Sequence, residues 1–135
     1  MRRKNKDEVL MNNSNVYNLY QQAHARVESP SRLIEMLYEG VLRFSALARK
    51  SVEENDIEKK IYYINRITDI FTELLNILDY DNGGEVAIYL TGLYTQQIKF
   101  LTQANVENDV SKIDIVIKVT RGLLDAWREI HQNEL

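Results

Sequence analysis

The stretch that decides the fold is residues 29–54, SPSRLIEMLYEGVLRFSALARKSVEE. Ser29-Pro30 predicts a helix start, because a serine hydroxyl can cap free N–H groups and proline is tolerated at the first helical position. Apolar residues then recur at steps of three and four, the period of one helix face: Leu33, Leu37, Val41, Phe44, Ala48 and Val52. A second apolar set lies beside them: Ile34, Met36, Tyr38 and Leu42. The stretch therefore predicts a long helix with two covered faces.

Three further apolar stripes of the same period follow, over roughly residues 57–78, 86–104 and 110–130. Asp56 and Asp109 are the third residues of two similar hexapeptides, ENDIEK (54–59) and ENDVSK (107–112), and we expect each to cap the helix that follows it. Residues 79–84, DYDNGG, interrupt the pattern with two consecutive glycines. The chain thus reads as helices joined by short turns.

One segment is ambiguous by itself. Residues 113–120, IDIVIKVT, are β-branched and half-alternating, as a strand would be. No partner strand is recognisable elsewhere, and an isolated strand leaves its backbone groups unpaired. We therefore predict helix there. The predicted fold is all-α, an antiparallel four-helix bundle of helices about 20–24 residues long, with a short N-terminal helix or cap.

The length of 135 residues at 15.8 kDa corresponds to one domain. Residues 1–15 are polar and predict a flexible N-terminal tail, with Met11 as an alternative start; residues 16–135 are expected to form the bundle. Residues 16–23 hold a short amphipathic piece that is too short to be stable unless it docks. Five glycines, one proline and no cysteine argue against small β-barrels, disulfide scaffolds and thiolate metal sites.

Charge and hydropathy predict a cytoplasmic protein. The net charge is −3, and removing residues 1–10, with four bases and two acids, leaves −5 on the rest. Such a chain has no general electrostatic footprint for nucleic acid. The basic start is not followed by an apolar segment, and no apolar run approaches the length of a membrane span. We expect no direct membrane insertion.

Candidate catalytic groups are sparse. His24 and His131 lie near opposite ends of the chain, and neither belongs to a Glu-x-x-His metal pair. A histidine phosphotransfer domain is also a four-helix bundle, but it needs an exposed histidine in mid-helix. The carboxylates Asp69, Glu73 and Glu85 read as a solvated face rather than an acid–base pair. We predict no enzyme, no cofactor and no metal, with a phosphotransfer or helical adaptor domain as the alternative.

Two surface features remain. Residues 59–66, KKIYYINR, mix bases with aromatics as nucleic-acid surfaces do, although the apolar spacing and acidic body favour an ordinary solvated face. Apolar stripes also lie beside the core stripes of the first and last long helices. Their members are Ile34, Tyr38 and Leu42, then Ile115, Val119, Gly122 and Ala126. They predict either a broad core or a groove for a partner helix, which the small residues would let approach closely.

An ordered series of short motifs resembles the FliS family of flagellar secretion chaperones over about residues 16–131. The motifs are Tyr17-x-x-Tyr20, Ser29-Pro30, Leu33-Ile34-Glu35-Met36-Leu37-Tyr38-Glu39-Gly40, Leu78-Asp79-Tyr80, Gly83-Gly84-Glu85-Val86-Ala87, Leu93-Tyr94, Ala104-Asn105-Val106-x-Asn108-Asp109 and Ala126-Trp127. The series departs from the family at residues 1–10, which precede its usual start, and at Asp81-Asn82, where Glu-Lys is common.

The resemblance implies a cytoplasmic, monomeric helical chaperone that binds the C-terminal segment of flagellin and prevents premature polymerisation. It implies delivery of the loaded complex to the FlhA export gate, and a co-chaperone or an anti-sigma factor are further possible partners. By the resemblance, flagellin would contact Tyr17, Tyr20, Ile34, Leu37 and Tyr38. Because Tyr17 and Tyr20 share one face, we expect that face to cover part of the apolar groove when flagellin is absent.

Overall fold

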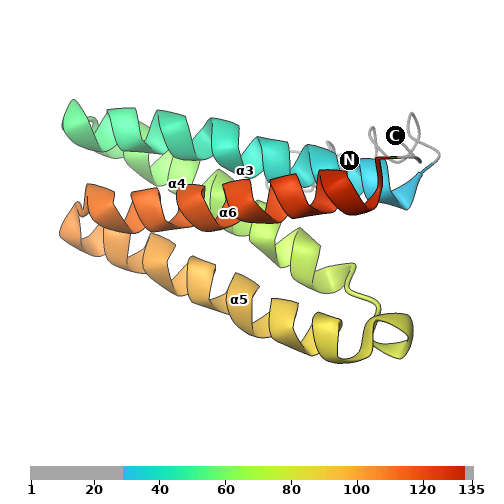
Figure 1. Cartoon of the computed structure of the whole chain (residues 1–135). Helices are drawn as coiled ribbons and strands as arrows, with labels where there is room; N and C mark the ends of the chain where they lie inside the picture. The colour runs from blue at the N-terminus through green and yellow to red at the C-terminus, as the bar shows by residue number, and fades with distance from the viewer. Residues whose placement is uncertain (1–28, 133–135) are drawn as a thin grey trace, which may run out of the picture.

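The computed structural model describes residues 29–132, which form four helices and, within that range, no strand. The helices are α3 (Pro30–Glu53), α4 (Ile57–Asn76), α5 (Tyr80–Glu107) and α6 (Val110–Ile130). Consecutive helices run in opposite directions (Figure 1), and α3 and α5 each pack against both α4 and α6. The predicted antiparallel four-helix bundle is confirmed, including helix over residues 113–120. The predicted tail and the short segment of residues 16–23 lie outside the described residues.

The two hairpin turns at one end of the bundle follow the predicted chemistry. The side chain of Asp56 accepts a hydrogen bond from the backbone N–H of Lys59 at 3.1 Å. That of Asp109 accepts one from the backbone N–H of Ser111 at 2.9 Å. Asparagine, which tolerates the left-handed conformation better than most residues, precedes each capping aspartate at φ 57° and 53°. Asparagine therefore turns the chain and aspartate restarts the helix.

A buried lysine connects these two turns. Lys60 is only 6% exposed, and its Nζ donates to the backbone oxygen of Asn105 at 2.9 Å and to Oδ1 of Asn108 at 2.6 Å. Asn105 lies in the last turn of α5, where free carbonyls and the helix dipole favour a positive charge. The lysine thus stabilises the end of α5 and fixes it against α4.

Two local expectations were wrong. Ser29 is the N-cap residue of α3, but its hydroxyl makes no capping bond, because it lies 2.6 Å from the hydroxyl of Ser31 instead. The interruption at residues 79–84 is also smaller than expected. Asp79 caps a helical turn that begins at Tyr80, and only Gly84, at φ 50° and ψ −121°, departs from helical geometry. A glycine can adopt this conformation without a Cβ clash.

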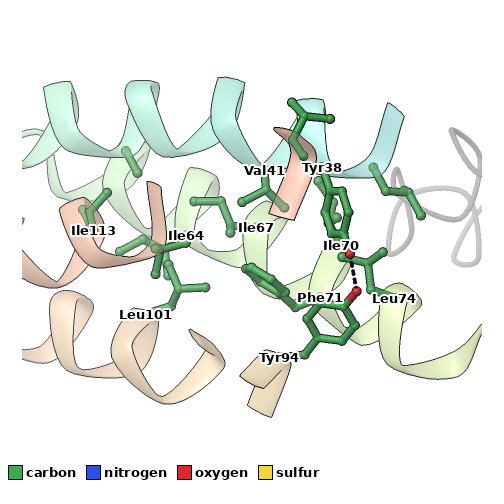
Figure 2. Close-up of a cluster of buried hydrophobic side chains, with 14 of the residues drawn as sticks. Tyr38, Val41, Ile64, Ile67, Ile70, Phe71, Leu74, Tyr94, Leu101 and Ile113 are labelled. Carbon is green, nitrogen blue, oxygen red and sulfur yellow. Dashed lines mark hydrogen bonds between the residues drawn. The ribbon is translucent and has the colours of Figure 1, made fainter. Parts of the chain in front are cut away.

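The core runs along the bundle axis, and each helix contributes apolar side chains that are almost completely buried (Figure 2). Ile67 and Phe71 of α4, Leu101 of α5 and Val116 of α6 have no exposed surface. Burying side chains of this size stabilises the fold by about 1.5–3 kcal/mol each. The β-branched residues of α6 are tolerated in a helix because this tertiary packing outweighs their propensity.

Ion pairs join α3 to α6 at their outer edge. Arg128 donates from Nε to Glu35 at 2.7 Å and from Nη2 to Glu39 at 2.6 Å. Arg49 donates to Asp114 at 2.8 Å near the other end. Within residues 29–132 these three are the ion pairs that connect different helices. The α3–α6 edge is therefore held by charge as well as by apolar packing.

Candidate functional site: an apolar cavity at one end of the bundle

A cavity of about 180 Å³ opens at the end of the bundle where α4 stops and α5 begins. In Figure 1 this end is the wider one, because the α4–α5 connection lies away from the adjacent ends of α3 and α6. All four helices contribute to an almost entirely apolar lining: Ile34, Tyr38, Leu74, Ile77, Leu78, Asp79, Gly83, Val86, Ala87, Leu90, Tyr94 and Trp127. Such a cavity suits an apolar side chain rather than a charged ligand.

The inner wall of the cavity is formed by two tyrosines from opposite helices. The hydroxyls of Tyr38 and Tyr94 lie 2.5 Å apart and pair with each other, as the dashed line in Figure 2 shows. Burial raises the pKa of Tyr38, although its bond to Tyr94 opposes the change. Burial, with added effects of Tyr38, also raises the pKa of Tyr94. Both phenols therefore stay neutral at physiological pH, and one hydroxyl donates a hydrogen bond to the other.

Trp127 closes the cavity on the α6 side. Its ring lies edge-on to Tyr38 with centroids 6.4 Å apart, and its Nε1 donates to the backbone oxygen of Ser31 at 2.7 Å. The ring of His131 lies over it at a centroid distance of 4.3 Å. Because Ser31 belongs to the first turn of α3, this bond fixes the start of α3 against α6.

Exposed apolar side chains lie on the same part of α5. Val86, which lines the cavity, is 64% exposed, and Ile88 and Tyr89 on the next residues of α5 are each 66% exposed. Tyr80 is 51% exposed, and its hydroxyl lies 2.5 Å from that of Thr91 across the bend at Gly84. Several large apolar groups close together on a surface mark a place where a partner binds.

The structure divides the predicted partner-binding residues between different environments. Ile34 and Tyr38 line the cavity. Leu37, at 6% exposure, belongs to the core, and Leu42 is half-buried against it. These four therefore lie inside the bundle or at its edge. Tyr17 and Tyr20 lie outside the described residues.

The remaining four form a separate stripe on the outer surface of α6. Ile115, Val119, Gly122 and Ala126 are exposed or half-buried, and none of them lines the cavity. A Cβ added at Gly122 would meet nothing within 4 Å, so packing inside this chain does not require a glycine there. The structure thus offers two apolar surfaces, the cavity and the α6 stripe, instead of one continuous groove.

Of the twelve residues that line the cavity, only Ile34 and Tyr38 were predicted as site residues; those missed include Leu74, Val86, Leu90, Tyr94 and Trp127. Most of them occur at the three- and four-residue spacing of core residues. That spacing does not indicate that a void lies beside them. Val86, Tyr94 and Trp127 do fall in the short motifs that carry the family resemblance, and that signal could have found them.

The residues considered for catalysis are not assembled into a site. Asp69 lies 2.8 Å from Arg66, and burial raises its pKa. His131 is half-buried at the end of α6, and His24 lies outside the described residues. Within residues 29–132 no group of three or more His, Asp or Glu residues could hold a metal ion. In the same range no helix is long and apolar enough to cross a membrane.

A helical bundle that presents an apolar cavity beside exposed apolar side chains defines a class of small helical binding proteins. Comparison with known families gives the particular one: residues 12–134 match the family described as "Flagellar protein FliS". The chain belongs to the FliS family of flagellar secretion chaperones.

Relatives from several bacteria point to the same family. The chain is 56% identical over 124 residues to the flagellar secretion chaperone FliS of Campylobacter jejuni, covering 92% of this chain and 97% of the relative. It is 31% identical to that of Bacillus subtilis, covering 89% of each chain. It is 35% identical to that of Salmonella typhimurium, covering 76% of each chain. The expected family is thereby confirmed.

Proposed function

We propose that this protein is a cytoplasmic export chaperone for flagellin. It binds the C-terminal segment of flagellin, prevents premature polymerisation and delivers the subunit to FlhA, the flagellar export gate. Membership of the FliS family supports the chaperone role. The apolar cavity with its exposed rim is the observation that carries the binding function.

A flagellin segment of this kind needs a temporary partner. An amphipathic segment that is disordered before assembly exposes an apolar face, which a temporary partner must cover. A cavity of about 180 Å³ receives roughly one large apolar side chain, and the exposed side chain of Val86, which lines the cavity, extends that contact. Because the client must pay the entropy of ordering on binding, the complex stays weak enough to release it.

The α6 stripe is the second part of the proposed contact. Ile115, Val119, Gly122 and Ala126 follow one another at steps of four, three and four, so they share one helix face. Gly122 and Ala126 would let the backbone of a client helix approach closely. We therefore propose that one part of the client fills the cavity while another lies along α6. Leu37 in the core and Leu42 packed against it lie on the same helix as Ile34 and Tyr38.

Residues 16–23 are proposed to act at the cavity. The chain enters the described fold at Ser29, next to the bond between Ser31 and Trp127, so a preceding segment is within reach. If this segment only covers the cavity, deletion of residues 1–23 should tighten binding and promote aggregation. If Tyr17 or Tyr20 also contacts the client, the deletion should weaken binding, and we expect this second result.

Calorimetry with a synthetic peptide of the flagellin C-terminus tests the proposal. Ala87 is 2% exposed and lines the cavity, so Ala87→Leu should fill the void and weaken binding by about tenfold, equivalent to roughly 1.4 kcal/mol. The matched control is Ala46→Leu on the exposed surface of α3. Equal affinity in both variants, with helicity retained, would exclude the cavity as the client site.

The α6 stripe has its own matched pair of variants. Gly122→Arg should weaken peptide binding by a similar factor, because it places a charge in the proposed contact. Gly92→Arg is the control, since a Cβ at either glycine meets no other atom within 4 Å. Delivery is tested with the purified cytoplasmic domain of FlhA, which should bind the loaded complex and not the empty chaperone. Light scattering should report a monomer.

A further inference from the structure

A stacked array of aromatic and arginine side chains lies across α3 and α4, away from the cavity and the α6 stripe. Phe44 of α3 and Tyr63 of α4 are stacked at a centroid distance of 6.2 Å, and Tyr62 meets Tyr63 edge-on at 5.3 Å. Arg43 lies over the ring of Phe44 at 5.2 Å, and Arg66 over the ring of Tyr62 at 5.4 Å. We call these five residues the arginine–aromatic patch.

The patch continues into exposed residues on both helices. Arg43, Leu47 and Lys50 follow at steps of four and three, so they share one face of α3, and all three are exposed. Lys59 stands three residues before Tyr62 on α4, with 66% of its side chain exposed. The result is a surface with basic groups around tyrosine and leucine in a chain whose net charge is negative.

The cations of this surface are only partly neutralised. No carboxylate within residues 29–132 forms an ion pair with Arg43 or Lys50. Lys59 approaches Asp56 only at 3.9 Å. A guanidinium that lies over a ring still directs its N–H groups outward in its own plane, where a carboxylate can accept two of them. The patch is therefore prepared for negatively charged side chains.

We propose that the arginine–aromatic patch docks an acidic amphipathic helix of a second protein. Carboxylates on that helix pair with Arg43, Lys50 and Lys59, and its apolar side chains cover Tyr62 and Leu47. Tyrosine and arginine are the residue types that carry most binding energy at protein interfaces. A single strand of nucleic acid fits less well, because base stacking needs open ring faces and the guanidinium groups already cover two of them.

This docking surface is separate from the proposed flagellin site. None of its residues lines the cavity, and it lies on α3 and α4, whereas the stripe lies on α6. A client and an acidic partner can therefore bind at the same time. Docking of an acidic helix on the patch does not depend on the identity of the client. A negative result for the patch would therefore leave the flagellin proposal intact.

The test uses a fluorescent helical peptide with Glu and Leu along one face as the probe. Its twin with Gln at every Glu position is the control peptide. Full-length protein should bind the Glu peptide, and Arg43→Gln or Tyr62→Ala should each weaken binding by about three- to tenfold. Arg121→Gln, which alters an exposed arginine on α6, should leave the affinity unchanged. Added salt should weaken the Glu peptide and not the Gln peptide.

Circular dichroism of each variant shows that the helices are retained, and the flagellin peptide should bind Arg43→Gln as it binds the unaltered protein. Equal affinity for the Glu and Gln peptides would overturn the proposal. So would an equal loss in Arg121→Gln, or displacement of the Glu peptide by the flagellin peptide. Tighter binding of a labelled oligothymidylate, lost in Tyr62→Ala, would assign the patch to nucleic acid instead.

Discussion

Tyr94→Phe should destabilise the protein far more than the loss of one oxygen atom suggests. The hydroxyl of Tyr94 is 2.5 Å from that of Tyr38, and the two residues are only 2% and 1% exposed. Removing one hydroxyl leaves the other buried without its partner. An unsatisfied buried polar group costs about 1–3 kcal/mol, and we expect this loss in the free energy of unfolding. Tyr38→Phe should cost a similar amount for the same reason.

The double variant distinguishes the loss of a hydrogen-bond partner from a simple packing effect. When both residues are phenylalanine no polar group is left unpaired, so the combined loss should be about equal to one single loss or smaller. The coupling energy between the two sites should then be on the order of 1–3 kcal/mol. Urea unfolding followed by far-UV circular dichroism measures all four corners of the cycle. Additive losses would refute the claim that the hydroxyls depend on each other.

Alkaline pH provides a second readout of the same pair. Burial raises the pKa of both tyrosines above the ordinary value of about 10, so the folded state holds these protons more tightly than the unfolded state. Their contribution to stability is therefore complete below pH 10 and is lost as the pH rises above that value. The double phenylalanine variant should show a smaller decline in that range.

Three further predictions concern the turns and helix ends, and thermal or urea unfolding measures each. Gly84→Ala should cost about 1–3 kcal/mol because φ is positive at this residue. Gly92→Ala should instead stabilise α5 by about 0.5–1 kcal/mol. Losses of equal size in the two variants would contradict the backbone conformation of Gly84. Lys60→Met should cost about 1–3 kcal/mol by removing the two hydrogen bonds that the ammonium donates at the end of α5, and an unchanged midpoint would show that water replaces the ammonium. Asp109→Ala should cost about 1 kcal/mol and Ser29→Ala under about 0.5 kcal/mol, since only the aspartate makes a capping bond; the reverse order would be inconsistent with the structure.

The sequence was sufficient for the fold because the decisive signals are local. The period of three and four, the Asn-Asp turns and the scarcity of glycine and proline each act within a few residues, and together they define four helices. The conformation of Ser29 was not predictable in this way. Whether its hydroxyl bonds the backbone or Ser31 depends on the packing of the first turn, which the sequence pattern does not record.

The candidate site was less predictable because a cavity is a property of packing. Leu74 and Tyr94 stand on the same core period as Phe71 and Leu101, and nothing in that period distinguishes a filled position from one beside a void. Likewise, the spacing of its residues predicted the α6 stripe. The spacing did not predict that the stripe lies apart from Ile34 and Tyr38. That separation depends on the order in which the four helices surround the core.

The α3–α6 edge also has a consequence for how the chain folds. The other three helix interfaces join helices that are consecutive in sequence, so they form with short loops and little entropic cost. The α3–α6 interface instead unites residues as far apart as Glu35 and Arg128, separated by 93 positions, and it completes the ring. The interhelical ion pairs within residues 29–132 all lie on this edge. Contacts that form after the rate-limiting step govern how fast a protein comes apart, so salt should change the unfolding rate more than the folding rate.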